Sequence, residues 1–240
     1  MKILITNDDS VSAPQLIPLI KWCRKLGEVT VVVPKFEQSA KSHSIEIRNV
    51  FEIKQLELEP GITVWTVDST PADCVRFAVS GLKQRFDLVI SGINQGYNLG
   101  KDTMYSGTLA AATEAVTKGM NAIALSASLK YYDKAMEHLD CIFRYFEKNR
   151  LWEQNALYNV NIPKDPIGIR ITRLGNVSFS EEFIPEGNDM YFPGGSPIRA
   201  DGSDLTRDTD ACAAGYISVT PMATDRTNWN IYQKLETLNL

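Results

Sequence analysis

Residues 87–119 read DLVISGINQGYNLGKDTMYSGTLAAATEAVTKG, and this stretch combines a strand pattern, a polar loop and the start of a helix. Leu88-Val89-Ile90 predicts a short buried strand, and the Gly-, Asn- and Asp-rich segment after it predicts a loop. Ser106 stands where the N-cap of a small-residue helix belongs. A strand that leads through a polar loop into a helix N-terminus predicts a phosphate site at the carboxyl edge of a parallel sheet.

Strand and helix patterns alternate on both sides of this stretch as far as about residue 150. The alternation predicts an α/β fold, namely a Rossmann-like, doubly wound and mostly parallel sheet between two helix layers. The predicted strands lie at 2–6, 29–33, 44–53, 62–67, 88–90 and 122–125, and the predicted helices at 13–26, 69–82, 106–119 and 131–149.

The last ninety residues have a different character, because strand patterns at 157–162, 169–174 and 215–220 flank a long segment rich in Gly, Pro, Ser and acidic residues. A loop of such length in a compact domain is usually functional, an arm, or disordered. We expect one domain over residues 1–240, with a β-hairpin and helix extension used in oligomerisation. Its parts are a core of about 1–150 plus 157–175 and 215–220, an extended arm at about 179–207, and a C-terminal helix at about 227–240.

Composition excludes several classes of protein. The chain has 240 residues, 44% hydrophobic and 22% charged, with a formal net charge of −4, so nothing indicates a general nucleic-acid or membrane surface. No apolar run approaches the length of a bilayer span, and Met1-Lys2 leads directly into a predicted strand, so we expect no signal peptide. The four cysteines lie far apart without metal-binding spacing, which favours free thiols and a cytoplasmic location.

Asp8 and Asp9 end the first predicted strand and are the sharpest local signal for chemistry. Two carboxylates held together repel each other unless a cation or a proton lies between them. Oxygen ligands without Cys or paired His suit Mg²⁺ or Mn²⁺ rather than Zn²⁺. The alternative is that Asp8 caps the next helix while Asp9 is solvated.

Two further loops are expected to reach the same sheet edge. Ser39 follows the second strand and is a candidate for a metal shell or a phosphate contact, although an ordinary loop serine is the simpler interpretation. His43 is a candidate proton donor or an ordinary surface histidine. Asn94, Asn98 and the Ser106-Gly107-Thr108 helix start complete the set, and the alternative is a glycine-rich turn with a routine cap. The glycine spacing fits neither a dinucleotide-binding loop nor a P-loop.

Five motifs in the chain resemble the SurE family, the stationary-phase survival proteins. They are NDD at 7–9, TPADCV at 70–75, SGIN-x-G-x-N-x-G-x-D-x-x-YSGT at 91–108, NVNIP at 159–163 and GYISVTPMATDRT at 215–227. The motifs span nearly the whole chain, and the pattern at 91–108 has many defined positions.

This resemblance implies a metal-dependent nucleotidase that hydrolyses nucleoside 5′- and 3′-monophosphates to nucleoside and phosphate. It also implies one divalent cation per subunit, Mn²⁺ or Mg²⁺, and a homodimer or homotetramer that exchanges C-terminal segments. The metal ligands it implies are Asp8, Asp9, Ser39 and Asn94. The phosphate-binding and substrate-binding residues it implies are Asn7, Ser39, Asn98, Ser106, Gly107 and Thr108. The catalytic residues it implies are Asp8, Asp9, Asn94 and Ser106.

The first loop departs from the family pattern, because Ser10 and Gln15 stand where glycines are usual. If the backbone at position 10 needs a positive φ, serine costs on the order of 1 kcal/mol there. Glu46 also replaces a usual Thr or Ser. The departure motivates an alternative function, a catalytically weak metal- and nucleotide-binding regulatory protein of the same fold.

Two mechanisms and two other protein classes stay open from the sequence. Either a metal-associated water attacks phosphorus with Asp8 or Asp9 orienting it, or Asp8 attacks directly. A haloacid-dehalogenase-type phosphatase is disfavoured, because its second acid should stand where Ser10 does. A purely structural oligomer leaves the polar crevice unexplained.

Overall fold

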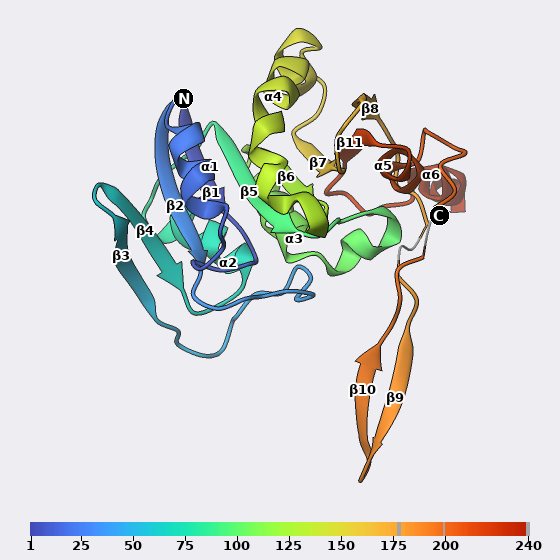
Figure 1. Cartoon of the computed structure of the whole chain (residues 1–240), viewed down its shortest axis with the longest axis horizontal. Coiled ribbons are helices and arrows are strands. Elements are labelled where there is room, and N and C mark those ends of the chain that lie inside the picture. The colour runs from blue at the N-terminus through green and yellow to red at the C-terminus, as the bar shows by residue number, and fades with distance from the viewer. Residues whose placement is uncertain (177–178, 199, 239–240) are drawn as a thin grey trace.

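The computed structural model describes residues 1–176, 179–198 and 200–238. Within those residues, nine strands form a central sheet in the order β3-β4-β2-β1-β5-β6-β7-β11-β8 (Figure 1). Its strands are β1 Lys2–Thr6, β2 Glu28–Pro34, β3 Ile53–Glu59, β4 Ile62–Val67, β5 Leu88–Gln95, β6 Asn121–Ala127, β7 Leu157–Ile162, β8 Gly168–Ile171 and β11 Tyr216–Met222.

The middle of the sheet is parallel, which confirms the predicted fold class. Strand β1 pairs in parallel with both β2 and β5, and β2–β4, β5–β6 and β6–β7 are parallel as well. In the described part of this sheet, the antiparallel pairs are β3–β4 and β7–β11, toward the two ends of the strand order. The chain runs outward from β1 through β2 to β4 and then returns to β5 beside β1. This reversal makes the β1–β5 junction the topological switch point, where open α/β sheets hold their ligands.

Helices cover both faces of the sheet, as the alternating side chains of β1 require. Ile3 and Ile5 pack in the cluster that includes α1 and α4, whereas Leu4 packs in the cluster that includes α2 and α3. The α-helices are α1 Leu16–Cys23, α2 Pro71–Arg76, α3 Gly107–Thr117, α4 Leu139–Lys148, α5 Asp208–Ala213 and α6 Trp229–Leu235. Shorter helical turns occupy Phe77–Gly81, Gly100–Tyr105, Leu129–His138, Leu151–Glu153 and Glu236–Leu238.

The predicted strand over 44–53 is wrong, because side chains satisfy backbone groups that a strand would pair. The Thr70 hydroxyl donates to the Ser44 carbonyl at 2.7 Å. The Glu46 carboxylate accepts the backbone N–H groups of residues 48 and 49, and these bonds lower the pKa of Glu46 to about 2. Local side-chain bonds of this kind compete with sheet pairing. Glu46, where the family usually has Thr or Ser, therefore stabilises the conformation of this loop.

The predicted helix over 131–149 is only partly correct. Its second half is α4, Leu139–Lys148, whereas its first half is a 3₁₀ segment interrupted at Tyr131, whose φ is −134°. Helix α5 was not predicted from the sequence. Its six residues are too few to give a periodic apolar pattern.

The C-terminal extension leaves the body of the molecule as a hairpin (Figure 1). Strands β9 Glu182–Gly187 and β10 Met190–Gly194 pair antiparallel around Asn188 and Asp189, which have φ values of 51° and 59°. Two positive φ values suit the tight turn of a two-residue hairpin. The predicted arm at 179–207 contains this hairpin, and its residue 199 lies outside the described residues, as do 239–240 of the predicted C-terminal helix.

Across the described residues, every helix is too short or too polar to span a lipid bilayer.

Candidate active site

Asp8 and Asp9 follow β1 directly and lie at the topological switch point of the sheet. Asp8 is only 4% exposed, and its Oδ1 accepts the Thr108 hydroxyl at 2.6 Å. Asp9 is more exposed, and its Oδ2 accepts the backbone N–H of Gln95 at 3.0 Å. The two acids therefore join the end of β1 to the end of β5 and to the start of α3.

Burial raises the pKa of Asp8 to about 6, against the opposing effect of the Thr108 hydrogen bond and with a further rise from the charge of Asp9. Burial also raises the pKa of Asp9; the Gln95 N–H lowers it, and the charge of Glu37 raises it again. Both carboxylates are therefore held where their negative charge is costly. Such a pair is stabilised by a cation placed between its oxygens.

The N-terminus of α3 faces Asp8. Ser106 is the N-cap, and its hydroxyl accepts the Leu109 N–H at 3.0 Å. A Cβ placed on Gly107 would lie 2.9 Å from the Asp8 side chain and 3.2 Å from the Gln38 carbonyl. Glycine at this position therefore lets the helix start approach the carboxylate closely.

The end of β5 and the loop after it bring Asn94 and Asn98 to the same edge. The Asn94 amide nitrogen donates to the Gly96 carbonyl at 3.0 Å, which leaves the amide oxygen as the group able to face a cation. The Asn98 amide nitrogen donates to the Ser126 hydroxyl at 2.8 Å and lies 3.4 Å from the Thr108 hydroxyl. Asn98 and Thr108 are thus neighbours, as a shared phosphate site requires.

The loop after β2 contacts the site through its backbone. The Gln38 N–H donates to the Asp8 carbonyl at 2.8 Å, which places Ser39 one residue from that contact. The Ser39 hydroxyl itself donates to Glu37 at 2.7 Å rather than to either aspartate. His43 is paired with Glu114 on α3 at 3.0 Å.

Asn7 and Ser10 shape the first loop. The Asn7 amide nitrogen donates to the Ser10 carbonyl at 2.8 Å, while its buried Oδ1 has no hydrogen-bond partner among the described residues. Ser10 has a φ of 74°, the left-handed region that glycine adopts without penalty. Serine therefore keeps a glycine-like backbone here.

Several residues that line or support this edge were not identified from the sequence. Tyr132 is buried, its hydroxyl has no partner among the described residues, and burial with the charges of Asp9 and Asp8 raises its pKa to about 12. Ser126, Asn159 and Asn161 all bond Asn98 and are fully buried. For Asn159 and Asn161, the sequence did offer a signal, because two asparagines in a strand that is expected to be buried need hydrogen-bond partners.

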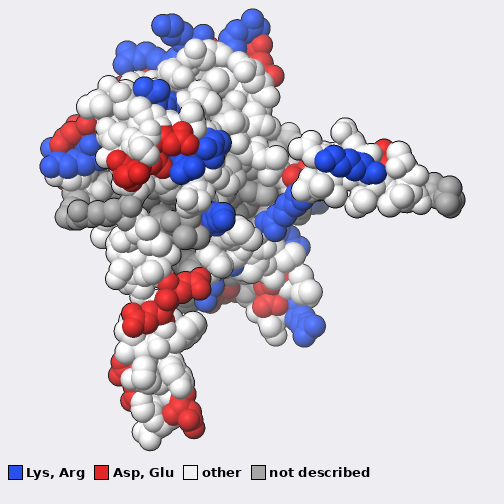
Figure 2. Space-filling view, turned by 90° about the vertical axis from the view of Figure 1, so that its right-hand side faces the viewer, with Lys and Arg blue, Asp and Glu red and all other residues white. Residues whose placement is uncertain are grey.

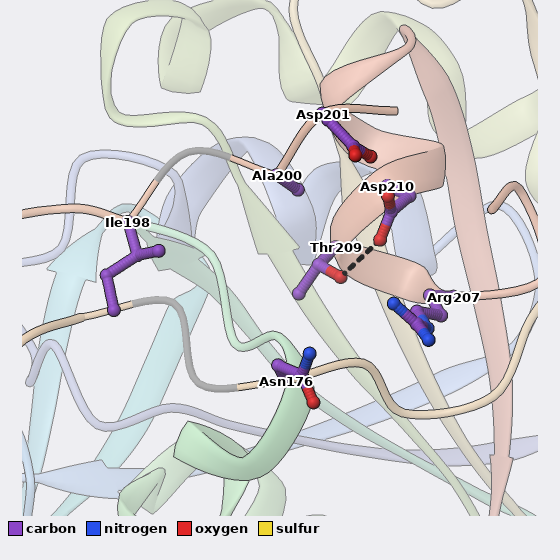
Figure 3. Close-up of a pocket in the computed structure, with 7 residues that line it drawn as sticks. All are labelled: Asn176, Ile198, Ala200, Asp201, Arg207, Thr209 and Asp210. Carbon is purple, nitrogen blue, oxygen red and sulfur yellow. Dashed lines mark hydrogen bonds between the residues drawn. The ribbon is translucent and has the colours of Figure 1, made fainter. Parts of the chain in front are cut away.

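A separate hollow of about 230 Å³ lies at the base of the hairpin beside α5 (Figure 3). Asp210 and Thr209 in it bond to each other at 3.0 Å, and Arg207 pairs with Asp204 at 3.1 Å. Because neither Asp8 nor Asp9 lines this hollow, we place the candidate active site at the switch point instead.

Fold and site together define a doubly wound α/β protein with two adjacent acidic side chains and a helix N-terminus at its switch point. The sequence model of the family described as "Survival protein SurE" matches residues 3–181. The chain belongs to the SurE family. Two relatives named "5'-nucleotidase SurE" are similar to it over 99% of its length. The protein of Legionella pneumophila is 37% identical with 97% of its own length covered, and that of Pelotomaculum thermopropionicum is 39% identical with 95% covered.

The solved structure of the SurE protein from Aquifex aeolicus shares the fold. It superposes on this chain with a TM-score of 0.79 and 30% identity, and the match covers 100% of both chains. The resemblance inferred from the motifs is therefore confirmed.

Proposed function

We propose that this protein is a metal-dependent 5′-nucleotidase that hydrolyses nucleoside 5′-monophosphates, and also 3′-monophosphates, to nucleoside and phosphate. Its relatives from Legionella and Pelotomaculum are named 5'-nucleotidase SurE, and the match to this chain covers almost their full length. The alternative of a catalytically weak regulatory binder finds no support in these comparisons.

One observation carries the proposal, namely the contact between the buried Asp8 carboxylate and the start of α3. A helix N-terminus attracts anions, whereas a carboxylate pair repels them. Both are satisfied when a divalent cation lies against the carboxylates and a phosphate group lies against the helix. A phosphomonoester bound with its metal fits this arrangement.

The donor set fits Mn²⁺ or Mg²⁺. Asp8 and Asp9 offer carboxylate oxygens, Asn94 an amide oxygen and Ser39 a hydroxyl, and oxygen ligands are those that these cations prefer. Among the described residues, no group of three or more His, Cys, Asp or Glu side chains could hold a metal ion, so the proposed ligand set depends on Asn94 and Ser39 for its other oxygens. We therefore propose Asp8, Asp9, Ser39 and Asn94 as ligands of one divalent cation, which supplies charge neutralisation and acidifies a bound water when present.

The protein's own groups account for phosphate binding and for orientation of the attacking water. The start of α3 at Gly107 supplies the positive end of a helix dipole beside the proposed anion site, and the Asn98 amide adds a neutral donor. Ser106 caps the start of this helix, and the Asn7 side chain stabilises the first loop by donating to the Ser10 carbonyl. The paired carboxylates orient the attacking water and accept its proton.

The test is phosphate release from a panel of 5′- and 3′-nucleoside monophosphates, with Mn²⁺, with Mg²⁺ and with EDTA. Asp9→Asn should lose at least a hundredfold in kcat/KM, within the range that electrostatic groups contribute. The matched control is Asp87→Asn, because Asp87 also accepts a backbone N–H, that of Lys2, but at the opposite end of β5. Release that persists in EDTA, or a full-rate Asp9→Asn, would refute a metallophosphatase.

We further propose that the extension forms a homodimer or homotetramer by exchange of C-terminal segments. Two projections leave the body, the hairpin and the C-terminal segment (Figure 2). Both carry exposed apolar side chains, including Phe183 at 71% and Leu238 at 70% exposure. Exposed apolar patches of this kind usually mark an interface.

The free cysteines fit the reducing cytoplasm that we propose as the compartment of this protein.

Light scattering tests the assembly. Replacing Phe183 and Phe192 on the hairpin with Ser should produce monomers, because both side chains are exposed in the single chain and would be buried by exchange. The control is Ile167→Ser, a residue that is 68% exposed but lies outside the extension. A wild-type monomer at micromolar concentration would contradict the proposal.

A further inference from the structure

Asn159 and Asn161 break the pattern of the strand that contains them. Strand β7 lies between β6 and β11 and is buried along its whole length, where Val, Leu and Ile are usual. Alternate residues point to opposite faces, so the two asparagines share one face while Val160 packs in the core cluster on the other. A fully buried amide is costly unless it is hydrogen-bonded, so this pair needs a reason.

Both asparagines bond the main chain of one residue, Asn98. The Asn161 side chain accepts the Asn98 N–H at 2.8 Å and donates to the Asn98 carbonyl at 2.9 Å. Asn159 donates to the same carbonyl at 2.8 Å. The peptide groups around a loop residue are thereby held by side chains from a strand some sixty positions further along the chain.

Ser126 completes the arrangement by accepting the Asn98 side-chain amide at 2.8 Å. Ser126 is directly opposite Asn161 in the β6–β7 register. These two neighbouring residues therefore bind the side chain and the main chain of Asn98, respectively. Among the described residues, the remaining N–H of the Asn98 amide contacts only the Thr108 hydroxyl, at 3.4 Å, a long hydrogen bond that a phosphate oxygen can replace.

We propose that Asn161, assisted by Asn159, is a positioning residue that aims the Asn98 amide at the phosphate of the substrate. This inference rests on the proposed function, because it takes Asn98 as a phosphate-binding group. Positioning shells of this kind matter because a small displacement of a binding group is expensive in rate.

The decisive variant is Asn161→Asp, which keeps an acceptor for the Asn98 N–H but sets a carboxylate oxygen against the Asn98 carbonyl. We expect kcat/KM to fall about 10- to 100-fold, the range seen when an outer-shell partner is lost. The apparent Kd for inorganic phosphate should rise about tenfold or more, measured in Mn²⁺ from the thermal shift that phosphate produces. Affinity for Mn²⁺ alone should stay within twofold, because Asn161 bonds none of the proposed metal ligands.

Two further variants keep the test sharp. Asn155→Asp is the matched control, because the Asn155 amide also bridges main-chain carbonyls, those of Leu157 and Met222, but at the other end of β7. It should leave the phosphate Kd unchanged. Ser126→Ala removes only the acceptor of the Asn98 amide and should weaken phosphate binding severalfold, which preserves the test if Asn161→Asp does not fold.

The outcomes separate this inference from the proposed function. Wild type that binds phosphate but releases none from any nucleotide refutes the nucleotidase, while the phosphate Kd of the variants still decides the role of Asn161. An unchanged phosphate Kd in folded Asn161→Asp and in Ser126→Ala overturns the inference. So does a loss of Mn²⁺ affinity equal to the loss of phosphate affinity, since that result indicates general disruption of the site. Wild type that binds no phosphate overturns both proposals.

Discussion

No side chain fits between Gly107 and Asp8, because a Cβ on residue 107 would lie 2.9 Å from the Asp8 Oδ2. The close approach brings the first turn of α3 against a buried carboxylate. Gly107→Ala should therefore displace either the helix start or Asp8, and lower kcat/KM by roughly a hundredfold, the effect of a shift of about 1 Å at a reacting centre. Steady-state kinetics on a nucleoside monophosphate measures this loss.

The control for Gly107→Ala is Gly168→Ala on β8. A Cβ there would lie 3.4 Å from the Tyr216 ring, an ordinary contact. This variant should retain wild-type kinetics. If Gly107→Ala is equally harmless, the helix start does not need its close contact with Asp8.

Thr108 supplies the only side-chain hydrogen bond that the described residues give Asp8, at 2.6 Å. Thr108→Val keeps the shape of the side chain but leaves the buried carboxylate without this donor, and should cost about 1 to 3 kcal/mol in the free energy of unfolding. Because that hydrogen bond lowers the pKa of Asp8, the acid limb of the activity profile should move to higher pH.

Thermal unfolding and a pH–rate profile test the Thr108 prediction. Thr113→Val is the comparison, since Thr113 lies on the same helix but donates to the Leu109 carbonyl within it. Its effect on stability should stay near 0.5 kcal/mol, typical of positions away from a buried charge. An unshifted acid limb in Thr108→Val would show that Asp8 does not control it.

Local patterns were enough to predict the elements that carry the site. Strands β1 and β7 have the bounds expected from the sequence, 2–6 and 157–162, and Ser106 is the N-cap that its hydroxyl suggested. These features depend on neighbours within a few residues, so a single sequence reveals them. The doubly wound sheet also followed, because alternating strands and helices restrict the topology.

Long-range relationships could not be predicted in the same way. That Asn159 and Asn161 bond Asn98 depends on β7 lying beside β6, which no local pattern in LYNVNI specifies. The wrong strand prediction at 44–53 has a local cause, because the Glu46 carboxylate accepts main-chain N–H groups of its own loop. Both cases are side-chain bonds to the main chain that propensity does not register.

The pKa of Asp8 predicts how stability depends on pH in the metal-free protein. Folding raises this pKa from 3.8 to about 6, so the folded state binds a proton more tightly than the unfolded state between those values. The contribution of Asp8 to stability should therefore fall as pH rises from about 4 to about 6 and then stay constant. The expected loss is roughly 3 kcal/mol, from the size of the shift.

Asp8→Asn isolates this effect, because every other titrating group is shared with wild type. At pH 7.5 without metal the variant should be more stable by about 1 to 3 kcal/mol in denaturant unfolding, and the difference should vanish below about pH 4. Saturating Mn²⁺ should stabilise wild type but not the variant. A wild type that is more stable than Asp8→Asn in EDTA at pH 7.5 would contradict the raised pKa.

Ser10 offers the last prediction, because its φ of 74° is a conformation that serine adopts at a cost. Ser10→Gly should be more stable than Ser10→Ala by about 1 kcal/mol, since alanine keeps the strain and glycine removes it. Lys83, with a φ of 55°, is the control: Lys83→Gly and Lys83→Ala should differ in stability in the same direction without any change in kinetics. Nucleotide hydrolysis decides what Ser10 means for function. Wild-type and Ser10→Gly rates within twofold would show that serine preserves the catalytic loop, whereas a gain above tenfold would mean that serine restrains catalysis, as the regulatory alternative requires.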